Sequence, residues 1–401
     1  MQMNKPLEGL RVLDLTHMLS GPYGAMILAD LGAETVKVEP LHGEGTRKLL
    51  ASSPKYSVGD QGAYFITLNR NKQSVAVDLK TPEGLGVFHD LVKTADIVID
   101  NFSAGVTNKL GIDYAHLSDI NPRIITCSIS GFGSSGPNYQ RPAFDQVAQA
   151  LGGGMSITGS DRNHPTRSGI PIGDLSGGMF GVMGVLAALY ERERSGRGQH
   201  VDISMLDCQI SLLNYMATMY FLSDEDPYPI GNAHFVHVPY NSYATADGHI
   251  IVAVIFDSFW ENLLEVVDYP PFHDEKYKTQ PGRLADQELI DAKLNEIFST
   301  GTSDDWLTQL EAKRIPCARV NQFSQALSDE QVLARNMVVE LHHPGGQSTR
   351  GPGNPIKLSR TDEESFSPAP LLGQHTDEVL AQILGYSPEK IDALKDAGIV
   401  A

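Results

Sequence analysis

Asp174 has the surroundings in this chain that most favour covalent chemistry. It lies in the stretch Ile172-Gly173-Asp174-Leu175-Ser176-Gly177-Gly178, just before a long apolar segment. Glycine has no Cβ, so a ligand can approach the backbone closely there. The positive end of a helix dipole would also favour the ionised carboxylate. An ionised, approachable carboxylate can carry an acyl or phosphoryl group covalently. A structural alternative remains open, in which Asp174 caps a helix over 175–194 by accepting a backbone N–H.

The elements that position Asp174 follow an alternating pattern. Strand, helix and strand joined by short connections indicate parallel βαβ units and an α/β fold. The pattern predicts strands at 11–16, 35–39, 74–79, 95–100 and 123–130, with helices at 21–31, 82–94 and 104–110. Neither GxGxxG nor GxxxxGK[ST] occurs, so the usual dinucleotide and P-loop fingerprints are absent. The composition changes near residue 222, which indicates a smaller second domain.

The charge of the chain limits its partners. The formal net charge is −18, whereas nucleic acids and anionic membranes bind basic surfaces, so we expect neither as the main partner. Residues 47–80 are an exception, since this segment contains six cations and only two aspartates. They are Arg47, Lys48, Lys55, Arg70, Lys72 and Lys80, with Asp60 and Asp78. This basic island is a candidate site for a small polyanion. Scattered, solvated lysines are the alternative.

The cysteines and apolar runs bear on the compartment. No apolar run reaches the roughly 20 residues that span a bilayer, and residues 1–6 contain no signal-like apolar core. The three cysteines, Cys127, Cys208 and Cys317, are isolated and lack CxxC spacing. This pattern favours a reducing compartment and argues against a zinc site. We therefore expect a cytoplasmic protein without a metal.

Several motifs together resemble family III CoA-transferases, the CaiB/BaiF group. The similarity spans about residues 6–210 and 320–401 and is weakest in the second domain. It rests on Pro6-Leu7-Glu8-Gly9-Leu10-Arg11-Val12-Leu13-Asp14, Leu31-Gly32-Ala33-Glu34-Thr35-Val36-Lys37-Val38-Glu39, Asn69-Arg70-Asn71-Lys72, Asp100-Asn101-Phe102, Ile172-Gly173-Asp174, Gly196-Arg197-Gly198-Gln199 and Leu372-Gly373-Gln374-His375-Thr376-Asp377.

The resemblance implies an α/β fold and an assembly. The fold has a Rossmann-like large domain formed from both chain ends, plus a smaller α+β domain. We expect residues 1–222 to form the N-terminal part of the large domain, 223–330 the small domain, and 331–401 a segment that returns to the large domain. The resemblance also implies a homodimer of two interlocked rings, with coenzyme A entering as an acyl-CoA co-substrate.

The resemblance also implies roles for individual residues. Asp174 would be the nucleophile that attacks an acyl-CoA, giving an aspartyl anhydride and then an aspartyl-CoA thioester, which splits one difficult step into easier ones. Residues matching the coenzyme A site are Val77, Lys80, Asn101, Phe102 and Lys109. Some members carry a phosphate-binding arginine where this chain has Pro40, so Arg47 or Lys48 is expected to compensate. Some relatives have arginine at the position of Lys109, and a lysine there cannot make the bidentate contact that arginine makes with a phosphate.

Two other functions stay open at this point. The α-methylacyl-CoA racemases share the fold and use a histidine that is matched here by Phe144, which cannot move a proton. A coenzyme A-binding protein without turnover is the second. Asp145 matches an acid that some transferases place near the nucleophile, or it caps a helix at 146–151.

The acids exchanged are expected to be small dicarboxylates. The segment 231–240 contains Asn232, His234 and Tyr240, whose polar groups could contact a second carboxylate. This resembles members that exchange CoA between succinate and other dicarboxylates, so succinyl-CoA is the expected donor. A polar linker between domains is the alternative for this segment.

Overall fold

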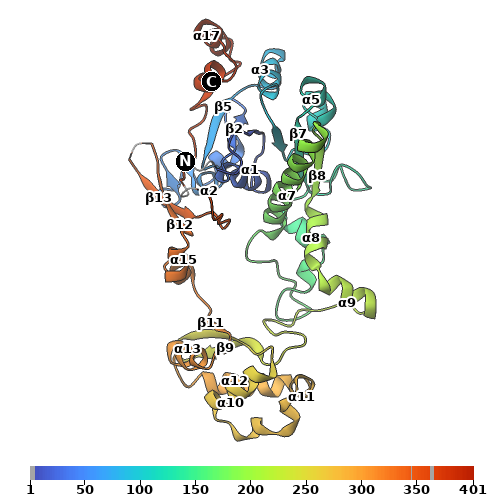
Figure 1. Ribbon diagram of the computed structural model, residues 1–401, viewed down its shortest axis with the longest axis vertical. Helices are drawn as coiled ribbons and strands as arrows, with labels where there is room; N and C mark the ends of the chain where they lie inside the picture. Colours follow the sequence, from blue (N-terminus) through green and yellow to red (C-terminus); the bar gives the residue numbers. More distant parts are fainter. Residues whose placement is uncertain (1–4, 345, 362–364) are drawn as a thin grey trace. The chain divides into compact units, whose positions relative to one another are not determined.

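The computed structural model of the chain describes residues 5–344, 346–361 and 365–401 (Figure 1). It divides into two compact units, each considered by itself. The first comprises Met1–Gly154, Ser168–Ser223 and Leu333–Ala401, and the second comprises Met155–Arg167 and Asp224–Val332. The expected domain boundaries at 222 and 330 stay predictions. The short segment 155–167 belongs to the second unit, which the composition does not indicate.

The first unit is built on a six-stranded parallel sheet with the order β5-β2-β1-β6-β7-β8. The strands are β1 Arg11–Asp14, β2 Glu34–Glu39, β5 Lys72–Ala76, β6 Ile97–Asp100, β7 Ile125–Ser130 and β8 His200–Ser204. Counted by chain position, this is the order 3-2-1-4-5-6 of doubly wound nucleotide-binding sheets. The predicted parallel α/β fold is therefore confirmed. In such sheets, ligands bind outside the carboxyl ends at the point where the order reverses, here between β1 and β6.

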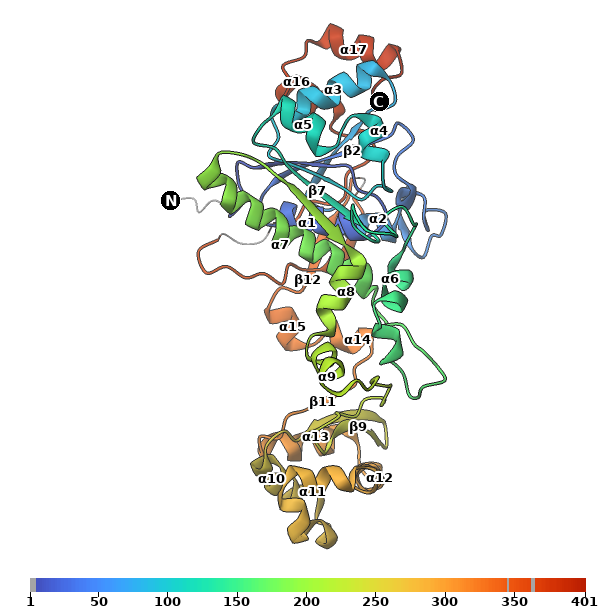
Figure 2. The same ribbon diagram turned by 90° about the vertical axis from the view of Figure 1, so that its right-hand side faces the viewer.

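Helices cover both faces of this sheet (Figure 2). Leu13 points toward α3, α5, α16 and α17, whereas its neighbour Val12 packs on the side of α1 and α7. Burial on both faces explains why the strands read as nearly continuous apolar runs. The helices of this unit are α1 Ser20–Asp30, α2 Ala63–Leu68, α3 Pro82–Val92, α4 Val106–Leu110, α5 Tyr114–Ile120, α6 Asp145–Leu151, α7 Ile172–Ser195, α8 Met205–Leu213, α9 Tyr215–Ser223, α16 Thr376–Gln382 and α17 Pro388–Asp396; α15 Glu330–Ala334 lies at the boundary.

Helix α7 has 24 residues and is long and apolar enough to cross a membrane, by length and composition alone. Half of its most apolar window is buried, and Val182, Val185 and Ala188 pack in the core beneath the sheet. Gly196 ends the helix in the left-handed conformation at φ 71°, as the glycine stop in the sequence predicts. The helix is thus packed as a core helix of the first unit.

Buried charges hold the loop that follows β1. Lys72 Nζ lies 2.8 Å from Asp14 Oδ2 and donates to the carbonyl of Pro22 at 3.0 Å, and all of these groups are buried. Lys37 Nζ donates to the carbonyl of Thr16 at 2.7 Å. Burial lowers the pKa of Lys72 to about 8, although Asp14 opposes this shift. Two lysines therefore fix both ends of the loop between β1 and α1.

Other cations of the basic island are also used inside the fold. Arg47 pairs with Glu39 at 2.6 Å, and Arg70 pairs with Asp30 at 2.6 Å. Because half of the island is buried in ion pairs, only Lys48, Lys55 and Lys80 are left exposed. The sequence shows the number of charges in the island but not this division.

The C-terminal segment completes the edge of the sheet beside β5. Val400 bridges to Val77 in antiparallel fashion, and the amide of Ala401 donates to the carbonyl of Ala76 at 3.2 Å. Two small hairpins complete the strands of this unit: β3 Ser57–Val58 with β4 Gln61–Gly62, and β12 Val338–His342 with β13 Ser348–Pro352.

The second unit contains an antiparallel sheet and its own core. The sheet has the order β11-β10-β9, and its core gathers around Trp260, Tyr243 and Phe298. Its elements are β9 Tyr240–Thr245, β10 Gly248–Ala253, α10 Asp257–Val267, α11 Gln280–Ala285, α12 Gln287–Phe298, α13 Ser303–Ala312, β11 Cys317–Arg319 and α14 Phe323–Ala326.

Candidate active site

Asp174 lies inside the first turn of α7. The helix begins at Ile172, so Asp174 is its third residue, and the position before the helix is held by Pro171, which makes no side-chain cap. The alternative in which Asp174 caps a helix over 175–194 is therefore wrong, because the helix starts three residues earlier. Its carboxylate is left available for another role.

Asp145 supplies the cap that α7 lacks. Its Oδ1 accepts the backbone N–H of Gly173 at 2.8 Å and that of Asp174 at 3.3 Å, while Oδ2 accepts from the Gln149 amide at 2.7 Å. A Cβ on Gly173 would lie 3.0 Å from Oδ1, so glycine is what permits this close approach. The expected cap of helix 146–151 is wrong, since Phe144 holds that position and Asp145 is the first residue of α6.

Ser20 holds the other side of the same turn. Its hydroxyl donates to the carbonyl of Asp174 at 2.8 Å, across from α1 to α7. A Cβ on Gly178 would lie 2.6 Å from the carbonyl oxygen of Ser20, so only glycine lets these two helices pack so closely. The backbone of Asp174 is thus fixed from both sides by side chains of other elements.

The carboxylate of Asp174 is half-buried and has no hydrogen-bond or ion-pair partner among the described residues. Burial is the main reason that its pKa is raised to about 6, and the negative charge of Asp145 adds to it. The sequence suggested that the helix dipole would favour ionisation, but burial and Asp145 outweigh the dipole. Asp174 is still mostly ionised at neutral pH, and it is not neutralised by a permanent partner.

Asn101 and Phe102 lie at the reversal point of the sheet. They follow β6. The side-chain amide of Asn101 forms two hydrogen bonds with the backbone of His17: its oxygen accepts from the His17 N–H at 2.9 Å, and its nitrogen donates to the His17 carbonyl at 2.7 Å. The rings of His17 and Phe102 are 5.7 Å apart. These three residues therefore form one surface at the carboxyl ends of β1 and β6, where doubly wound sheets bind nucleotides.

The remaining expected coenzyme A residues differ in accessibility. Lys80 and Lys109 are exposed, and no side-chain partner of either is found among the described residues. Val77 is almost fully buried in the core, so its side chain packs inside the unit. Arg47 donates to Glu39 and to the carbonyl of Pro370, which leaves Lys48 as the exposed cation near Pro40.

A pocket of about 350 Å³ opens beside Phe102, at the carboxyl ends of β6, β7 and β8. Its charged lining is acidic and includes Asp100, Asp113 and Asp202. Burial raises the pKa of Asp100 to about 6. This acidic lining would repel the phosphates of a nucleotide. Among the described residues, no cluster of three His, Cys, Asp or Glu could hold a metal ion.

The expected substrate residues lie in one segment of the second unit, which runs from Asn232 to Tyr240, the first residue of β9. Nδ1 of His234 accepts the backbone N–H groups of Val236 and His237, both at 3.1 Å, so its proton is on Nε2. The His234 ring stacks on Tyr240 with centroids 5.2 Å apart, and Asn232 donates to Ser242 Oγ at 2.8 Å. Burial lowers the pKa of His234, and His237 adds to this effect. His234 is thus a neutral donor held in a fixed orientation.

Three residues near Asp174 escaped the sequence analysis: His17, Ser20 and Tyr64. Burial raises the pKa of Tyr64, and the negative charges of Asp174, Glu44 and Asp145 raise it further, so its phenol lies in their field. His17 could have been found, because it follows the first strand of a βαβ unit. Nothing local marks Tyr64.

Comparison with known proteins agrees with these features. The family model described as CoA-transferase family III matches residues 7–376. The succinyl-CoA:glutarate CoA-transferase of Homo sapiens is 34% identical over 398 residues, covering 99% of this chain and 90% of that protein. The succinyl-CoA:mesaconate CoA-transferase of Haloarcula marismortui is 39% identical over 383 residues, covering 93% and 95%.

A solved structure gives the same result for the fold. The crystal structure of a CAIB/BAIF family protein from Brucella suis has a TM-score of 0.85 and 34% identity, covering 95% of this chain and all of that chain. Sequence and fold thus agree over nearly the whole length, and this chain is an enzyme of CoA-transferase family III.

Proposed function

We propose that this enzyme moves coenzyme A from an acyl-CoA to a carboxylic acid through covalent intermediates on Asp174. The observation that carries the proposal is the state of that side chain. Its carboxylate is half-buried and unpaired among the described residues, while its backbone is held by Asp145 and Ser20. A fixed but unneutralised carboxylate is suited to act as a nucleophile.

In the proposed steps, each bond that forms replaces one that breaks, and the enzyme returns to its starting state. Asp174 attacks the thioester carbonyl of the donor, forming an acyl–aspartyl anhydride and releasing the coenzyme A thiolate. The thiolate then attacks the aspartyl carbonyl, which gives an aspartyl-CoA thioester and the free donor acid. The acceptor carboxylate attacks this thioester, and the thiolate released attacks the acceptor carbonyl of the new anhydride. The product thioester leaves, and Asp174 is again a carboxylate.

The proposed coenzyme A site is the reversal point of the sheet. Asn101 and Phe102 form its floor with His17, and Lys80 and Lys109 supply exposed positive charge for phosphates. Val77 contributes only through its position after β5, because its side chain is buried. Lys48 takes the place expected for Arg47, whose donors are used by Glu39 and Pro370.

Two competing functions are less well supported. Racemisation needs a proton-moving histidine, but Phe144 holds that position, and it is 66% exposed and its ring has no group that can carry a proton. A coenzyme A-binding protein without turnover would not need an unpaired carboxylate at the start of α7. Incubating the protein with an acyl-CoA and a second acid separates the transferase from both alternatives, because only a transferase makes a new CoA ester.

The proposed substrates are succinyl-CoA and a second small dicarboxylate. The Nε2–H of His234, oriented by its neighbours, is suited to donate to a carboxylate oxygen, and Asn232 and Tyr240 lie in the same segment. Two relatives named as succinyl-CoA transferases act on glutarate and mesaconate, both dicarboxylates. These names support the dicarboxylate class, without selecting one acid.

We infer an interlocked homodimer in the cytoplasm. Helices α7, α8 and α9 leave large apolar side chains in solvent, including Tyr190 at 70%, Phe221 at 80% and Leu222 at 83% exposure. Such a surface marks an interface. A second copy fits it because the resemblance implies rings that pass through each other. Light scattering would report the mass of two chains. The three free cysteines favour the cytoplasm, which cell fractionation can check.

The first prediction concerns the nucleophile. Asp174→Ala should lower the transfer rate by roughly four orders of magnitude or more, since the covalent route is lost. Coenzyme A binding should persist, because the fold does not depend on this side chain. Borohydride added during turnover should reduce the thioester on Asp174, which peptide mass spectrometry detects. Asp207→Ala, an exposed aspartate in the first turn of α8, is the control. Transfer by Asp174→Ala near the wild-type rate would show that the mechanism is wrong.

The second prediction concerns pH. Because Asp174 must be ionised to attack and its pKa is about 6, kcat/KM for the acyl-CoA should fall as pH drops through about 6. Asp145→Asn removes the neighbouring charge but keeps an oxygen for the Gly173 N–H. The acidic limb should therefore move to lower pH, by up to about one unit. An unmoved limb in Asp145→Asn, like that expected for Asp207→Asn, would contradict this electrostatic coupling.

The third prediction concerns the nucleotide. Replacing Lys80 or Lys109 by alanine should weaken binding of CoA esters by about 1–3 kcal/mol, the size of a charge-assisted contact. The measurement is KM for several CoA esters, with kcat unchanged. Lys93→Ala is the matched control, since Lys93 is an exposed lysine at the end of α3 that pairs with Asp90. If both variants keep the KM of the wild type, neither lysine belongs to the site.

The fourth prediction concerns the acids. With succinyl-CoA as donor, kcat/KM for glutarate or itaconate should exceed that for a fatty acid by at least about tenfold, because a buried donor left unpaired by the wrong acid is costly. Glutarate, itaconate, oxalate and a fatty acid form the panel of acceptors. His234→Gln, which keeps a donor, should lose less than His234→Phe. A preference for the fatty acid would exclude the dicarboxylate class and leave the transferase function untouched.

A further inference from the structure

A second pocket lies at the other end of α1 from the candidate active site. It has a volume of about 610 Å³, within the range of small-molecule sites. Asp30 and Leu31 line it, and they close the 11-residue helix that begins at Ser20. At 1.5 Å per residue, about 16 Å of helix separates this pocket from the turn beside Asp174. This pocket is therefore distinct from the candidate active site.

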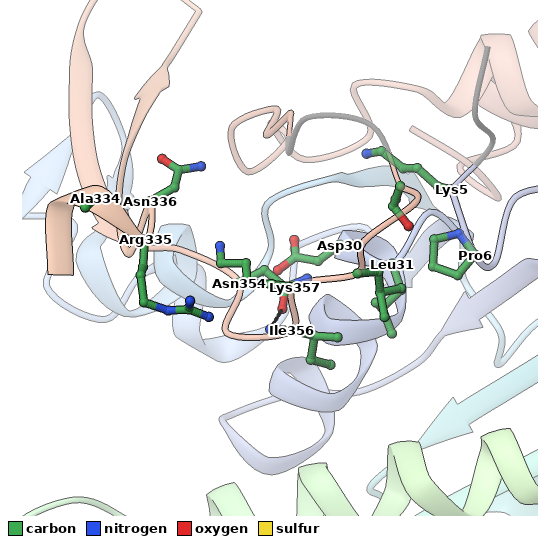
Figure 3. Close-up of a pocket in the computed structure, with 12 residues that line it drawn as sticks. Lys5, Pro6, Asp30, Leu31, Ala334, Arg335, Asn336, Asn354, Ile356 and Lys357 are labelled. Atoms are coloured by element: carbon green, nitrogen blue, oxygen red, sulfur yellow. Dashed lines mark hydrogen bonds between the residues drawn. The ribbon is translucent and has the colours of Figure 1, made fainter. Parts of the chain in front are cut away.

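Four segments that are distant in the sequence form this pocket. They are the stretch before β1, the end of α1, the end of α15 with the residues after it, and the segment after β13. Figure 3 shows the guanidinium of Arg335 extending toward Asn354 and Lys357, with Lys5 on the opposite side. Cationic side chains thus reach the pocket from both chain ends.

The charge of the lining is positive in a chain whose net charge is −18. Asp30 is the one carboxylate among the described lining residues; it is already balanced by Arg70 at 2.6 Å and accepts from the Asn71 amide at 2.8 Å. Arg335 has no carboxylate partner among the described residues, and Lys5 makes only a 3.4 Å contact with the Ser365 hydroxyl. Lys5 and Arg335 therefore leave positive charge facing the described part of the cavity.

The rest of the lining is partly apolar. Leu31 is buried at the base, whereas Ile356 and Leu358 are 42% and 47% exposed. A site that combines cations with exposed hydrocarbon matches a ligand with an anionic head and an apolar segment. An inorganic anion would leave the hydrocarbon uncovered, and a neutral apolar molecule would leave the cations unused.

We propose that this pocket is a second binding site, for a small organic anion whose head is a carboxylate or a phosphate and whose body is apolar. It is separate from the site around Asp174 and does not depend on the reaction proposed there. The anionic head lies between Lys5 and Arg335, and the apolar body lies against Ile356 and Leu358.

The test uses hexanoate, hexyl phosphate and the neutral hexanamide as probes in ligand-observed NMR titrations of the full chain. Saturating coenzyme A is present throughout, so that probe binding near Asp174 is suppressed. We expect saturable binding of at least one anion and weaker binding of hexanamide. Lys5→Ala and Arg335→Ala should each raise the dissociation constant about fivefold, the effect of one solvent-exposed charge pair. Added salt should weaken the binding further.

The controls remove the same charges elsewhere in the first unit. Lys93→Ala and Arg123→Ala change exposed residues paired with Asp90 and Glu193, and neither should alter the dissociation constant. Several results would overturn the proposal: equal binding of hexanamide, equal weakening in the control variants, unchanged binding in both Lys5→Ala and Arg335→Ala, or no saturable binding of either anion.

Discussion

The hydrogen bonds from the first turn of α7 to Asp145 are the constraint on which the candidate site depends. The first N–H groups of a helix have no partner within the helix, and a capping side chain normally precedes them. Here that position is Pro171, and the acceptor comes from α6 instead. This arrangement frees Asp174 from capping its own helix. It also places a second negative charge beside the carboxylate, which adds to the main effect of burial in raising the pKa of Asp174.

The buried charges under the loop after β1 explain why this turn can be held so firmly. Asp14, Lys37 and Lys72 are fully buried, and removing one partner of such a set generally costs several kcal/mol. Their contacts with the carbonyls of Thr16 and Pro22 fix the loop that carries His17 and leads into Ser20. Ser20 then reaches the carbonyl of Asp174. A set of direct contacts thus joins the middle of the sheet to Asp174, the proposed nucleophile.

The sequence was sufficient for features that depend on local pattern. Apolar runs separated by segments of helical periodicity predicted the parallel sheet, and the glycines around Asp174 indicated the turn that carries it. Contacts between segments that are distant along the chain could not be predicted from the sequence. In the sequence, Arg47, Arg70 and Lys72 belong to the basic island, but in the structure each of them pairs with an acid from another element. The role of Asp145 depends on the packing of α6 against α7, which no local spacing encodes. The same is true of Tyr64, whose surroundings come from three separate elements.

The division of charge also bears on how a polyanion can bind this protein at all. Coenzyme A carries several negative charges, and a chain of net charge −18 repels it at long range. Screening limits that repulsion to about 8 Å at physiological ionic strength, so nearby cations decide the local field. Because Arg47, Arg70 and Lys72 are neutralised inside the fold, a coenzyme A site of the proposed kind would depend on Lys48, Lys80 and Lys109. Among the described residues, no cation pairs with Asp174, so its carboxylate would keep its charge for the proposed attack.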